Sequence, residues 1–227
     1  MNTIPTSQQP PAALIFDLDG TLVDTVDTRI TAWLRTFDQY RIPAERGQVA
    51  KLIGSDGRRL ARVVAEAAGS AIDADLAEEI DRCAGEIYSE LNTDPRPLPG
   101  ARELLQALDD MGLRWAIATS SRPEQVVASI KALKPARPPT IVDGSRVEHA
   151  KPAPDLLLFA ARELGVEPSR AWYVGDSVWD MQAARAARMP AIGVVSGSAT
   201  AGELEEAGAW LTVDDLNRLM RMITGPN

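Results

Sequence analysis

Short, mainly apolar runs recur along the chain, and a stretch with the spacing of an amphipathic helix follows most of them. Such runs, bounded by polar or turn-forming residues, are typical of buried β-strands. The runs lie at residues 12–16, 115–118, 140–142, 172–174, 191–195 and 210–213. This alternation predicts an α/β fold, with a doubly wound, Rossmann-like parallel sheet and helices on both of its faces.

The alternation stops between residues 24 and 96, where only helical patterns occur. Apolar residues recur with the helical period in stretches 25–40, 48–53, 59–68 and 75–91. A Pro-rich connector at residues 94–100 ends this block. We therefore predict a flexible tail at residues 1–11 and a core formed by residues 12–23 and 97–227. Residues 24–96 are predicted to form an α-helical domain inserted into this core. An insertion without a function of its own would give the same pattern.

Composition narrows the class of protein. The 227 residues carry a formal net charge of −8 without a basic stripe, which makes nucleic acid an unexpected partner. No apolar run reaches the roughly 18 residues of a membrane-spanning helix, so no membrane association is expected. The single cysteine, Cys83, excludes an intramolecular disulfide and fits a reducing compartment. Because the N-terminal residues lack the apolar stretch of a signal peptide, we expect a cytoplasmic protein. We also expect a monomer or a weak dimer.

Two acidic residues at the end of the first predicted strand are the most informative local feature. Asp17 and Asp19 follow the run 12–16 directly, and Gly20 comes after them. Two carboxylates this close repel each other unless a cation lies between them or one carries a proton. Both conditions suit phosphoryl transfer, in which one carboxylate attacks phosphorus and a second moves the leaving-group proton. A solvated turn with two aspartates would show the same local pattern.

Three further polar motifs stand near the ends of later elements. They are Thr119-Ser120-Ser121, Lys151-Pro152-Ala153-Pro154, and Asp176 with Asp180 in the stretch Gly175-Asp176-Ser177-Val178-Trp179-Asp180. Ligands of doubly wound sheets bind beyond the carboxyl ends of the strands, so the motifs are predicted to converge. Together, and in this order, the four motifs resemble those of the haloacid dehalogenase-like (HAD) hydrolase superfamily, in its phosphoglycolate phosphatase and β-phosphoglucomutase-like branch.

The resemblance implies a role for each motif. Asp17 would be the nucleophile that forms an aspartyl-phosphate, and Asp19 would be the general acid and base. Thr119 would donate a hydrogen bond to a phosphoryl oxygen, and Lys151 would offset phosphate charge. Mg²⁺ would be the cofactor, with oxygen ligands from Asp17, the backbone carbonyl of Asp19, Asp176 and Asp180. Without a metal, Asp176 would only cap a helix and Asp180 would be an exposed helix residue.

A second set of residues is predicted to bind the substrate: Gly20, Ser120, Ser121 and Arg122 in the core, and Arg58 and Arg59 in the helical block. The two serines precede a helix that begins at Pro123, where free N–H groups attract an anion. In the resembled family the helical block is a cap that closes over the site. The two block arginines stand between two helical patterns and are candidates for clamping a second anionic group.

These observations favour a Mg²⁺-dependent phosphatase that acts on a small phosphorylated metabolite, a phosphomonoester. A sugar-phosphate mutase is the nearest alternative, but similar mutases carry a histidine near the position of Arg29, and the one histidine here is His149. A haloacid dehalogenase would not need Asp19, and a phosphonate hydrolase of this type typically lacks an acid there. A catalytically idle phosphate-binding or regulatory protein is the alternative from another class; turnover of an aryl phosphate with Mg²⁺ would distinguish it.

Overall fold

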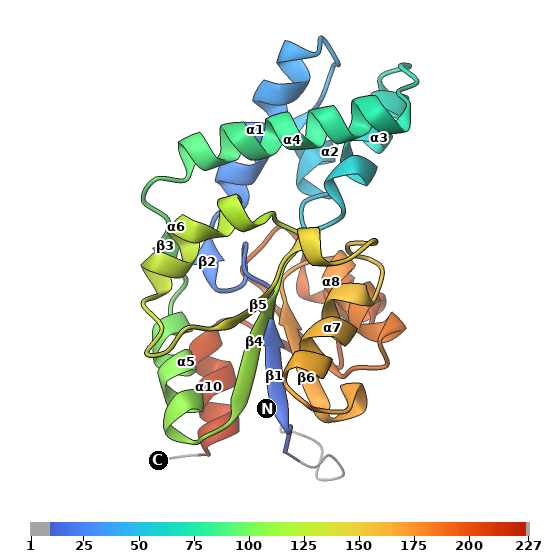
Figure 1. Cartoon of the computed structure of the whole chain (residues 1–227). Coiled ribbons are helices and arrows are strands. Elements are labelled where there is room, and N and C mark those ends of the chain that lie inside the picture. Colours follow the sequence, from blue (N-terminus) through green and yellow to red (C-terminus); the bar gives the residue numbers. More distant parts are fainter. Residues whose placement is uncertain (1–9, 226–227) are drawn as a thin grey trace.

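A parallel six-stranded sheet with strand order β5-β4-β1-β6-β7-β8 forms the centre of the molecule (Figure 1). This computed structural model describes residues 10–225, so most of the predicted tail lies outside the described residues. The strands are β1 (Ala13–Phe16), β4 (Arg114–Ala118), β5 (Thr140–Val142), β6 (Ala171–Gly175), β7 (Ala191–Val194) and β8 (Leu211–Val213). Each strand falls on one of the predicted apolar runs, and the predicted α/β fold is confirmed.

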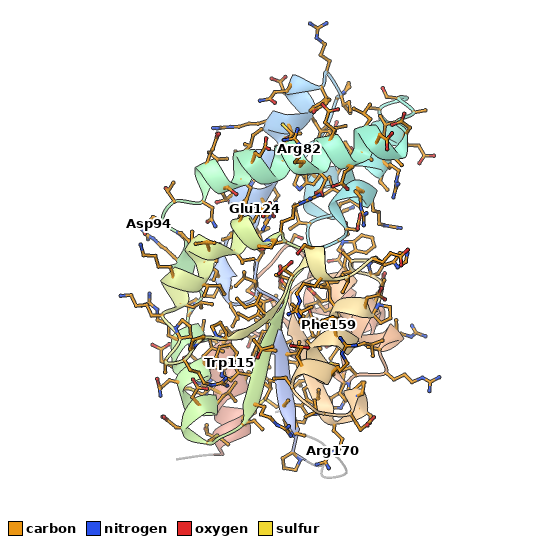
Figure 2. All side chains as sticks on the ribbon, in the orientation of Figure 1. Arg82, Asp94, Trp115, Glu124, Phe159 and Arg170 are labelled. Atoms are coloured by element: carbon orange, nitrogen blue, oxygen red, sulfur yellow. The ribbon has the colours of Figure 1, made fainter. Side chains whose placement is uncertain are left out.

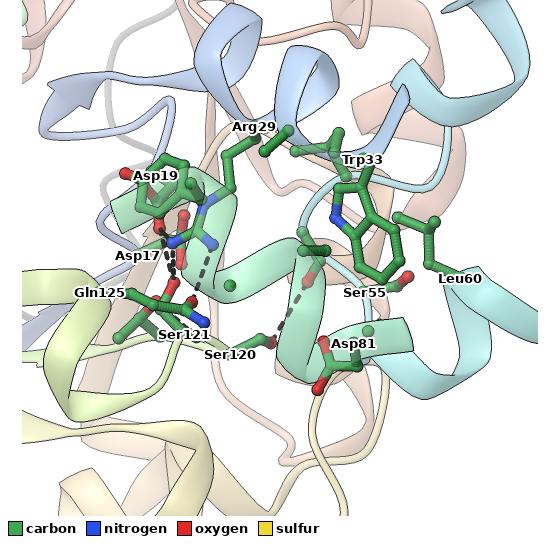
Figure 3. Close-up of a pocket in the computed structure, with 18 residues that line it drawn as sticks. Asp17, Asp19, Arg29, Trp33, Ser55, Leu60, Asp81, Ser120, Ser121 and Gln125 are labelled. Atoms are coloured by element: carbon green, nitrogen blue, oxygen red, sulfur yellow. Dashed lines mark hydrogen bonds and ion pairs between the residues drawn. The ribbon is translucent and has the colours of Figure 1, made fainter. Parts of the chain in front are cut away.

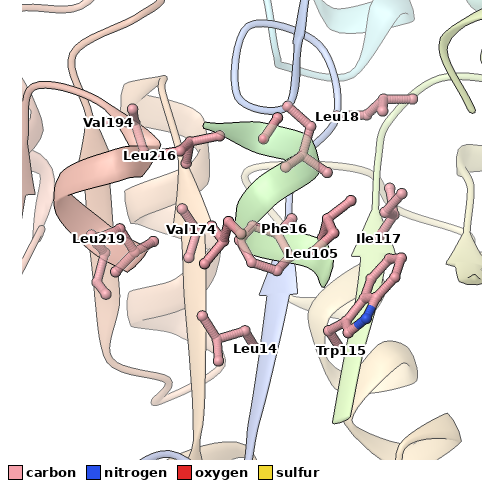
Figure 4. Close-up of a cluster of buried hydrophobic side chains, with 14 of the residues drawn as sticks. Leu14, Phe16, Leu18, Leu105, Trp115, Ile117, Val174, Val194, Leu216 and Leu219 are labelled. Atoms are coloured by element: carbon pink, nitrogen blue, oxygen red, sulfur yellow. The ribbon is translucent and has the colours of Figure 1, made fainter. Parts of the chain in front are cut away.

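Side chains of the central strand β1 alternate between two apolar layers. Leu14 and Phe16 pack on the face covered by α5 and α10 (Figure 4), and Ile15 packs on the face covered by α7 and α8. Burial on both faces explains why β1 appears in the sequence as a continuous apolar run. The surrounding helices are α5 (Ala101–Asp110), α6 (Pro123–Leu133), α7 (Asp155–Glu163), α8 (Val178–Ala186), α9 (Ala201–Ala207) and α10 (Leu216–Thr224), with short 3₁₀ helices η1 (Gly144–Arg146) and η2 (Pro168–Arg170).

All four predicted helical stretches between β1 and β4 contain helices, and these pack into a separate layer above the sheet (Figure 1). They are α1 (Val26–Gln39), α2 (Arg46–Ala50), α3 (Gly57–Ala67) and α4 (Ala74–Leu91). Their apolar faces form a cluster of their own, which includes Phe37, Leu60 and Ile80. We call these four helices and their connecting loops the helical block.

Two short strands attach the helical block to the core. β2 (Val23–Asp24) and β3 (Arg96–Pro97) pair as an antiparallel ribbon, with Val23 opposite Pro97. The sequence predicted only connectors at these positions, because strands of two residues are too short to show a period. The ribbon brings both connections side by side, and the block therefore lies over the carboxyl ends of the sheet strands (Figure 1).

Side-chain burial follows this arrangement (Figure 2). Trp115 is fully buried in the core, whereas Arg82 on α4 and Arg170 below the sheet are exposed. Across residues 10–225, we find no helix whose length and apolar character would let it cross a membrane.

Candidate active site

The four sequence motifs meet at the carboxyl ends of the three central strands. Asp17 follows β1, Thr119 follows β4 and Asp176 follows β6. Lys151, from the loop before α7, reaches across this edge, and its Nζ lies 2.5 Å from Oδ1 of Asp17 and 2.8 Å from Oδ1 of Asp180. Parallel strands bring their carboxyl ends to one edge, which is why motifs far apart in the chain converge here.

Three buried carboxylates form a cluster that fits a metal ion. Oxygen atoms of Asp17, Asp176 and Asp180 all lie within 4.8 Å of one another. Burial, together with the neighbouring charge of Asp180, raises the pKa of Asp17 to about 7. The charge of Lys151 opposes this shift but does not outweigh it. Burial, together with Asp180 and Asp17, also raises the pKa of Asp176 well above its ordinary value. One ammonium does not compensate three carboxylates, and a set of hard oxygen donors suits a divalent cation such as Mg²⁺.

The two acidic residues of the last motif have different surroundings. Asp180 accepts hydrogen bonds from Lys151, from the Tyr173 hydroxyl (2.9 Å) and from the backbone and hydroxyl of Ser177 (3.0 and 2.6 Å). Asp176 accepts one side-chain bond, from Thr21 to Oδ1 at 2.7 Å. Its Oδ2 has no hydrogen-bond donor among residues 10–225, which leaves this oxygen available to a cation.

Lys151 is fully buried, yet it keeps its charge. Burial by itself would lower the pKa of this ammonium, but Asp17 and Asp180 outweigh burial and raise the pKa above its ordinary range. A cation is therefore fixed next to the Asp17 carboxylate at any pH near neutrality.

A cavity of about 60 Å³ lies between the Asp17 edge of the sheet and the helical block (Figure 3). From the core it is lined by predicted site residues, namely Asp17, Asp19, Thr119, Ser120 and Ser121. From the helical block it is lined by Arg29, Trp33, Ser55, Leu60, Asp81 and Tyr88, among others. The predicted core residues thus share one cavity with Arg29, Trp33, Leu60, Asp81 and Tyr88, which the sequence analysis did not assign to the site.

Asp19 is held by four donors. Its Oδ1 accepts from Thr25 (2.7 Å) and Tyr88 (2.8 Å), and its Oδ2 accepts from Arg29 (2.9 Å) and Ser121 (2.8 Å). Burial would raise the pKa of Asp19, but the Arg29 charge and these hydrogen bonds outweigh it, so the pKa is lowered. In this closed arrangement Asp19 is therefore an ionised carboxylate.

Arg29, Tyr88 and Gln125 are the residues that the sequence analysis missed. Arg29 hydrogen-bonds Oε1 of Gln125 at 2.9 Å, and its guanidinium lies 3.5 Å from the centre of the Tyr88 ring. A signal existed for Arg29 alone, because it stands where similar mutases carry a histidine. Tyr88 and Gln125 are buried positions within helical patterns, and nothing local distinguishes them from core residues.

Four of the predicted substrate-binding residues lie outside this cavity, namely Gly20, Arg58, Arg59 and Arg122. Gly20 turns the chain with a φ of +84°, and a Cβ there would lie 2.4 Å from Oδ2 of Asp176. The position therefore requires glycine because the backbone packs closely against Asp176. Arg58 pairs with Asp56 at 2.7 Å, and the guanidinium of Arg59 lies 5.1 Å from the Trp179 ring. The acidic and aromatic neighbours of the two arginines draw both side chains away from Asp17.

Arg122 also turns away from Asp17 and binds the helical block instead. Its Nη2 lies 2.5 Å from Glu78 and 2.8 Å from Asp81, both on α4. With Arg58 it lines a second cavity of about 230 Å³ at the seam between block and core. Arg122 is the N-cap residue of α6, which begins at Pro123 as the sequence predicted.

Comparison with known proteins agrees with the motifs. The sequence matches the family described as haloacid dehalogenase-like hydrolase over residues 14–194. A phosphoglycolate phosphatase of Xylella fastidiosa (strain 9a5c) is 35% identical over 192 residues, which cover 83% of this chain and 82% of the relative. An N-acetylmuramic acid 6-phosphate phosphatase of Pseudomonas aeruginosa is 31% identical over 175 residues, which cover 76% of this chain and 76% of the relative.

Solved structures give the same result. The crystal structure of a hydrolase from Pseudomonas syringae has a TM-score of 0.87 to this chain at 35% identity, covering 93% of this chain and 97% of that one. The strand order, the four converging motifs and these relatives have one explanation: the chain belongs to the haloacid dehalogenase-like hydrolase family.

Proposed function

We propose that this protein is a Mg²⁺-dependent phosphatase that hydrolyses a small-molecule phosphomonoester through an aspartyl-phosphate. The observation that carries the proposal is the contact between Lys151 and Asp17 at 2.5 Å, beside the Asp176 carboxylate and beneath a closed cavity. An anionic nucleophile can approach an anionic phosphate only where fixed positive charge offsets their repulsion.

In this mechanism an oxygen of Asp17 attacks phosphorus, and the bond between phosphorus and the ester oxygen breaks. Asp19, which is ionised in this structure and must first take up a proton from solvent, gives that proton to the leaving oxygen, which departs as an alcohol. Asp19 then accepts a proton from water, whose oxygen attacks the phosphorus of the aspartyl-phosphate. Inorganic phosphate leaves, and Asp17 is regenerated.

The surrounding residues hold the phosphoryl group. Thr119 and Ser120 line the cavity with hydroxyl groups, and the start of α6 adds backbone N–H donors. Asp17, Asp176 and the backbone carbonyl of Asp19 would hold Mg²⁺, and Asp180 would act through water. When bound, the metal neutralises phosphoryl charge as phosphorus is transferred.

We further propose that residues 24–96 form a cap domain that opens and closes on the β2–β3 ribbon. Movement of the block away from the carboxyl ends of the strands would widen the access of a metabolite to the cavity. Closure excludes water and strengthens the interactions of the substrate with Lys151 and the metal. Because the cap covers the leaving-group side, it is the part of the molecule that selects the substrate.

The proposal is tested by turnover of p-nitrophenyl phosphate with Mg²⁺, followed by 2-phosphoglycolate and N-acetylmuramic acid 6-phosphate, which the names of the two relatives suggest. The Asp17→Asn variant keeps the shape of the side chain and loses its nucleophile, so kcat is expected to fall about 1,000-fold or more. Circular dichroism and thermal unfolding verify that the variant is folded. Absence of turnover by the wild-type enzyme on every ester, or retained activity of a folded variant, would refute the proposal and favour a phosphate-binding protein.

A further inference from the structure

Arg29 is the one basic side chain among the described residues that line the cavity next to Asp17. It projects from α1 of the helical block, and only 13% of its side chain is exposed (Figure 3). Its Nη2 donates to Asp19 and Ser121, and its Nη1 donates to Gln125. A guanidinium has five N–H donors. Within residues 10–225 these contacts leave Nε and one Nη1 hydrogen without a partner.

Substrate cannot use Asp19 as the structure places it. Both carboxylate oxygens are occupied by protein donors, yet the proposed mechanism requires one of them to face the leaving oxygen. Thr25 is buried outside the cavity lining and stays in place. The donors that face the cavity are Tyr88, Arg29 and Ser121, and of these Arg29 has the long side chain that can move furthest.

A guanidinium that is largely buried and leaves its carboxylate needs another anion. A buried charge without a partner is strongly unfavourable, so movement of Arg29 away from Asp19 requires a replacement acceptor. The other carboxylates of the cavity cannot serve, because Asp17 is bound by Lys151 and Asp81 by Arg122. The acceptor must therefore come from the substrate.

We propose that Arg29 determines the specificity of this enzyme by exchanging Asp19 for a carboxylate on the leaving group of the substrate. This inference rests on the proposed phosphatase function and names its substrate class, phosphomonoesters of short hydroxy acids. The exchange leaves Asp19 facing the ester oxygen only when the leaving group carries its own negative charge.

The geometry limits the distance between the substrate carboxylate and the ester oxygen. Arg29 lies one hydrogen bond, 2.9 Å, from Asp19, whose carboxylate must contact the leaving oxygen. The Tyr88 ring, 3.5 Å away, and Gln125 hold the guanidinium close to this place. The planar fork matches a carboxylate with two parallel hydrogen bonds, and the small cavity favours a leaving group of a few atoms.

The test compares two substrates of equal length. 2-Phosphoglycolate has a carboxylate on its leaving group, and 2-hydroxyethyl phosphate has a neutral hydroxyl in the same place. We expect the wild-type kcat/KM to be about 100-fold higher for 2-phosphoglycolate. In Arg29→Ala this preference is expected to disappear, because the loss of kcat/KM on the acid is expected to exceed the loss on the neutral ester by about 100-fold.

Two further variants make the test specific. Arg29→Lys keeps the charge but not the fork, so about one tenth of the preference is expected to remain, and this variant serves if Arg29→Ala does not fold. Arg46→Ala, which removes an exposed arginine of the same block bound to Asp27 at 2.6 Å, is expected to leave both rates unchanged.

An equal loss on both substrates in Arg29→Ala would overturn the inference, because Arg29 would then only position Asp19. A wild-type enzyme that hydrolyses p-nitrophenyl phosphate but shows no preference between the two esters would also overturn it, while the proposed function would stand. A wild-type enzyme that hydrolyses no ester would instead refute the proposed function and this inference with it.

Discussion

Asp176 and Asp180 come from one motif, yet their carboxylates have different hydrogen-bond partners and therefore different roles. The oxygens of Asp180 are saturated by Lys151, Tyr173 and Ser177, so this residue holds the lysine in place and caps α8. Asp176 keeps one oxygen without a donor among the described residues. The structure thus favours Asp176 as the direct metal ligand and leaves Asp180 to act through its neighbours.

This difference predicts unequal effects of two isosteric variants. Asp176→Asn is expected to weaken Mg²⁺ binding by more than about 100-fold, whereas Asp180→Asn is expected to weaken it by about tenfold or less. Asp180→Asn is expected to lower the free energy of unfolding by about 3 kcal/mol, because a buried ion-pair partner is lost. Isothermal titration calorimetry and urea unfolding measure the two quantities; equal losses of metal affinity would show that both residues ligate directly.

At the scale of elements, α4 connects the helical block to the catalytic edge at two places. Tyr88 near its end donates to Asp19, while Glu78 and Asp81 near its start bind Arg122 of the core. Block and core therefore close over the cavity mainly through polar contacts, and Trp179 of α8 adds an apolar contact with the cluster of the block. Such contacts can open without exposing a large apolar surface, which suits a cap that moves.

Removal of the Arg122 side chain is expected to favour the open cap. In Arg122→Ala the ion pairs with α4 are lost, and kcat/KM is expected to fall about fivefold for every substrate, because these pairs are partly exposed. Faster amide hydrogen exchange around Glu78 and Asp81 would accompany the loss. Arg102→Ala is the control, since Arg102 binds the Ala132 carbonyl within the core. Unchanged exchange in Arg122→Ala would show that these pairs do not hold the cap.

For the whole molecule, the site lies where separately packed parts meet. The sheet has an apolar cluster on each face, and the helical block has a third of its own. The proposed cap movement would therefore leave the main body of each cluster intact and would disturb only the contact of Trp179 with the block. The carboxylate cluster, in contrast, belongs wholly to the core, so the metal is expected to stabilise the core whether the cap is open or closed.

A chelator is expected to abolish activity, and Mg²⁺ is expected to restore it. Ca²⁺ should restore it poorly, because its longer bonds and larger number of ligands would misplace the attacking carboxylate. At about 100 times its Kd, Mg²⁺ is expected to raise the Tm by roughly 5 °C or more. Differential scanning fluorimetry measures this shift, with Asp176→Asn as the control that should not respond. Full activity of thoroughly demetallated enzyme would contradict the metal-dependent mechanism.

The sheet, the positions of its strands and the motifs at their ends could all be predicted from the pattern of residues along the chain. Apolar runs buried on both faces are visible without a structure, and so is the break in their alternation that marks the helical block. Because parallel strands all place their carboxyl ends at one edge, the meeting of Asp17, Lys151 and Asp176 also followed from the sequence pattern.

What the helical block contributes to the site depends on how the block packs on the core, which could not be predicted from the sequence. Tyr88 lies 69 positions from Asp19, and Gln125 lies 96 from Arg29, and no local pattern couples such pairs. Which block residues face the cavity depends on the orientation of α1 and α4 over the sheet, which the β2–β3 ribbon and the polar seam set together. A helical period shows that a face is buried, but it does not show whether that face meets a core or a substrate.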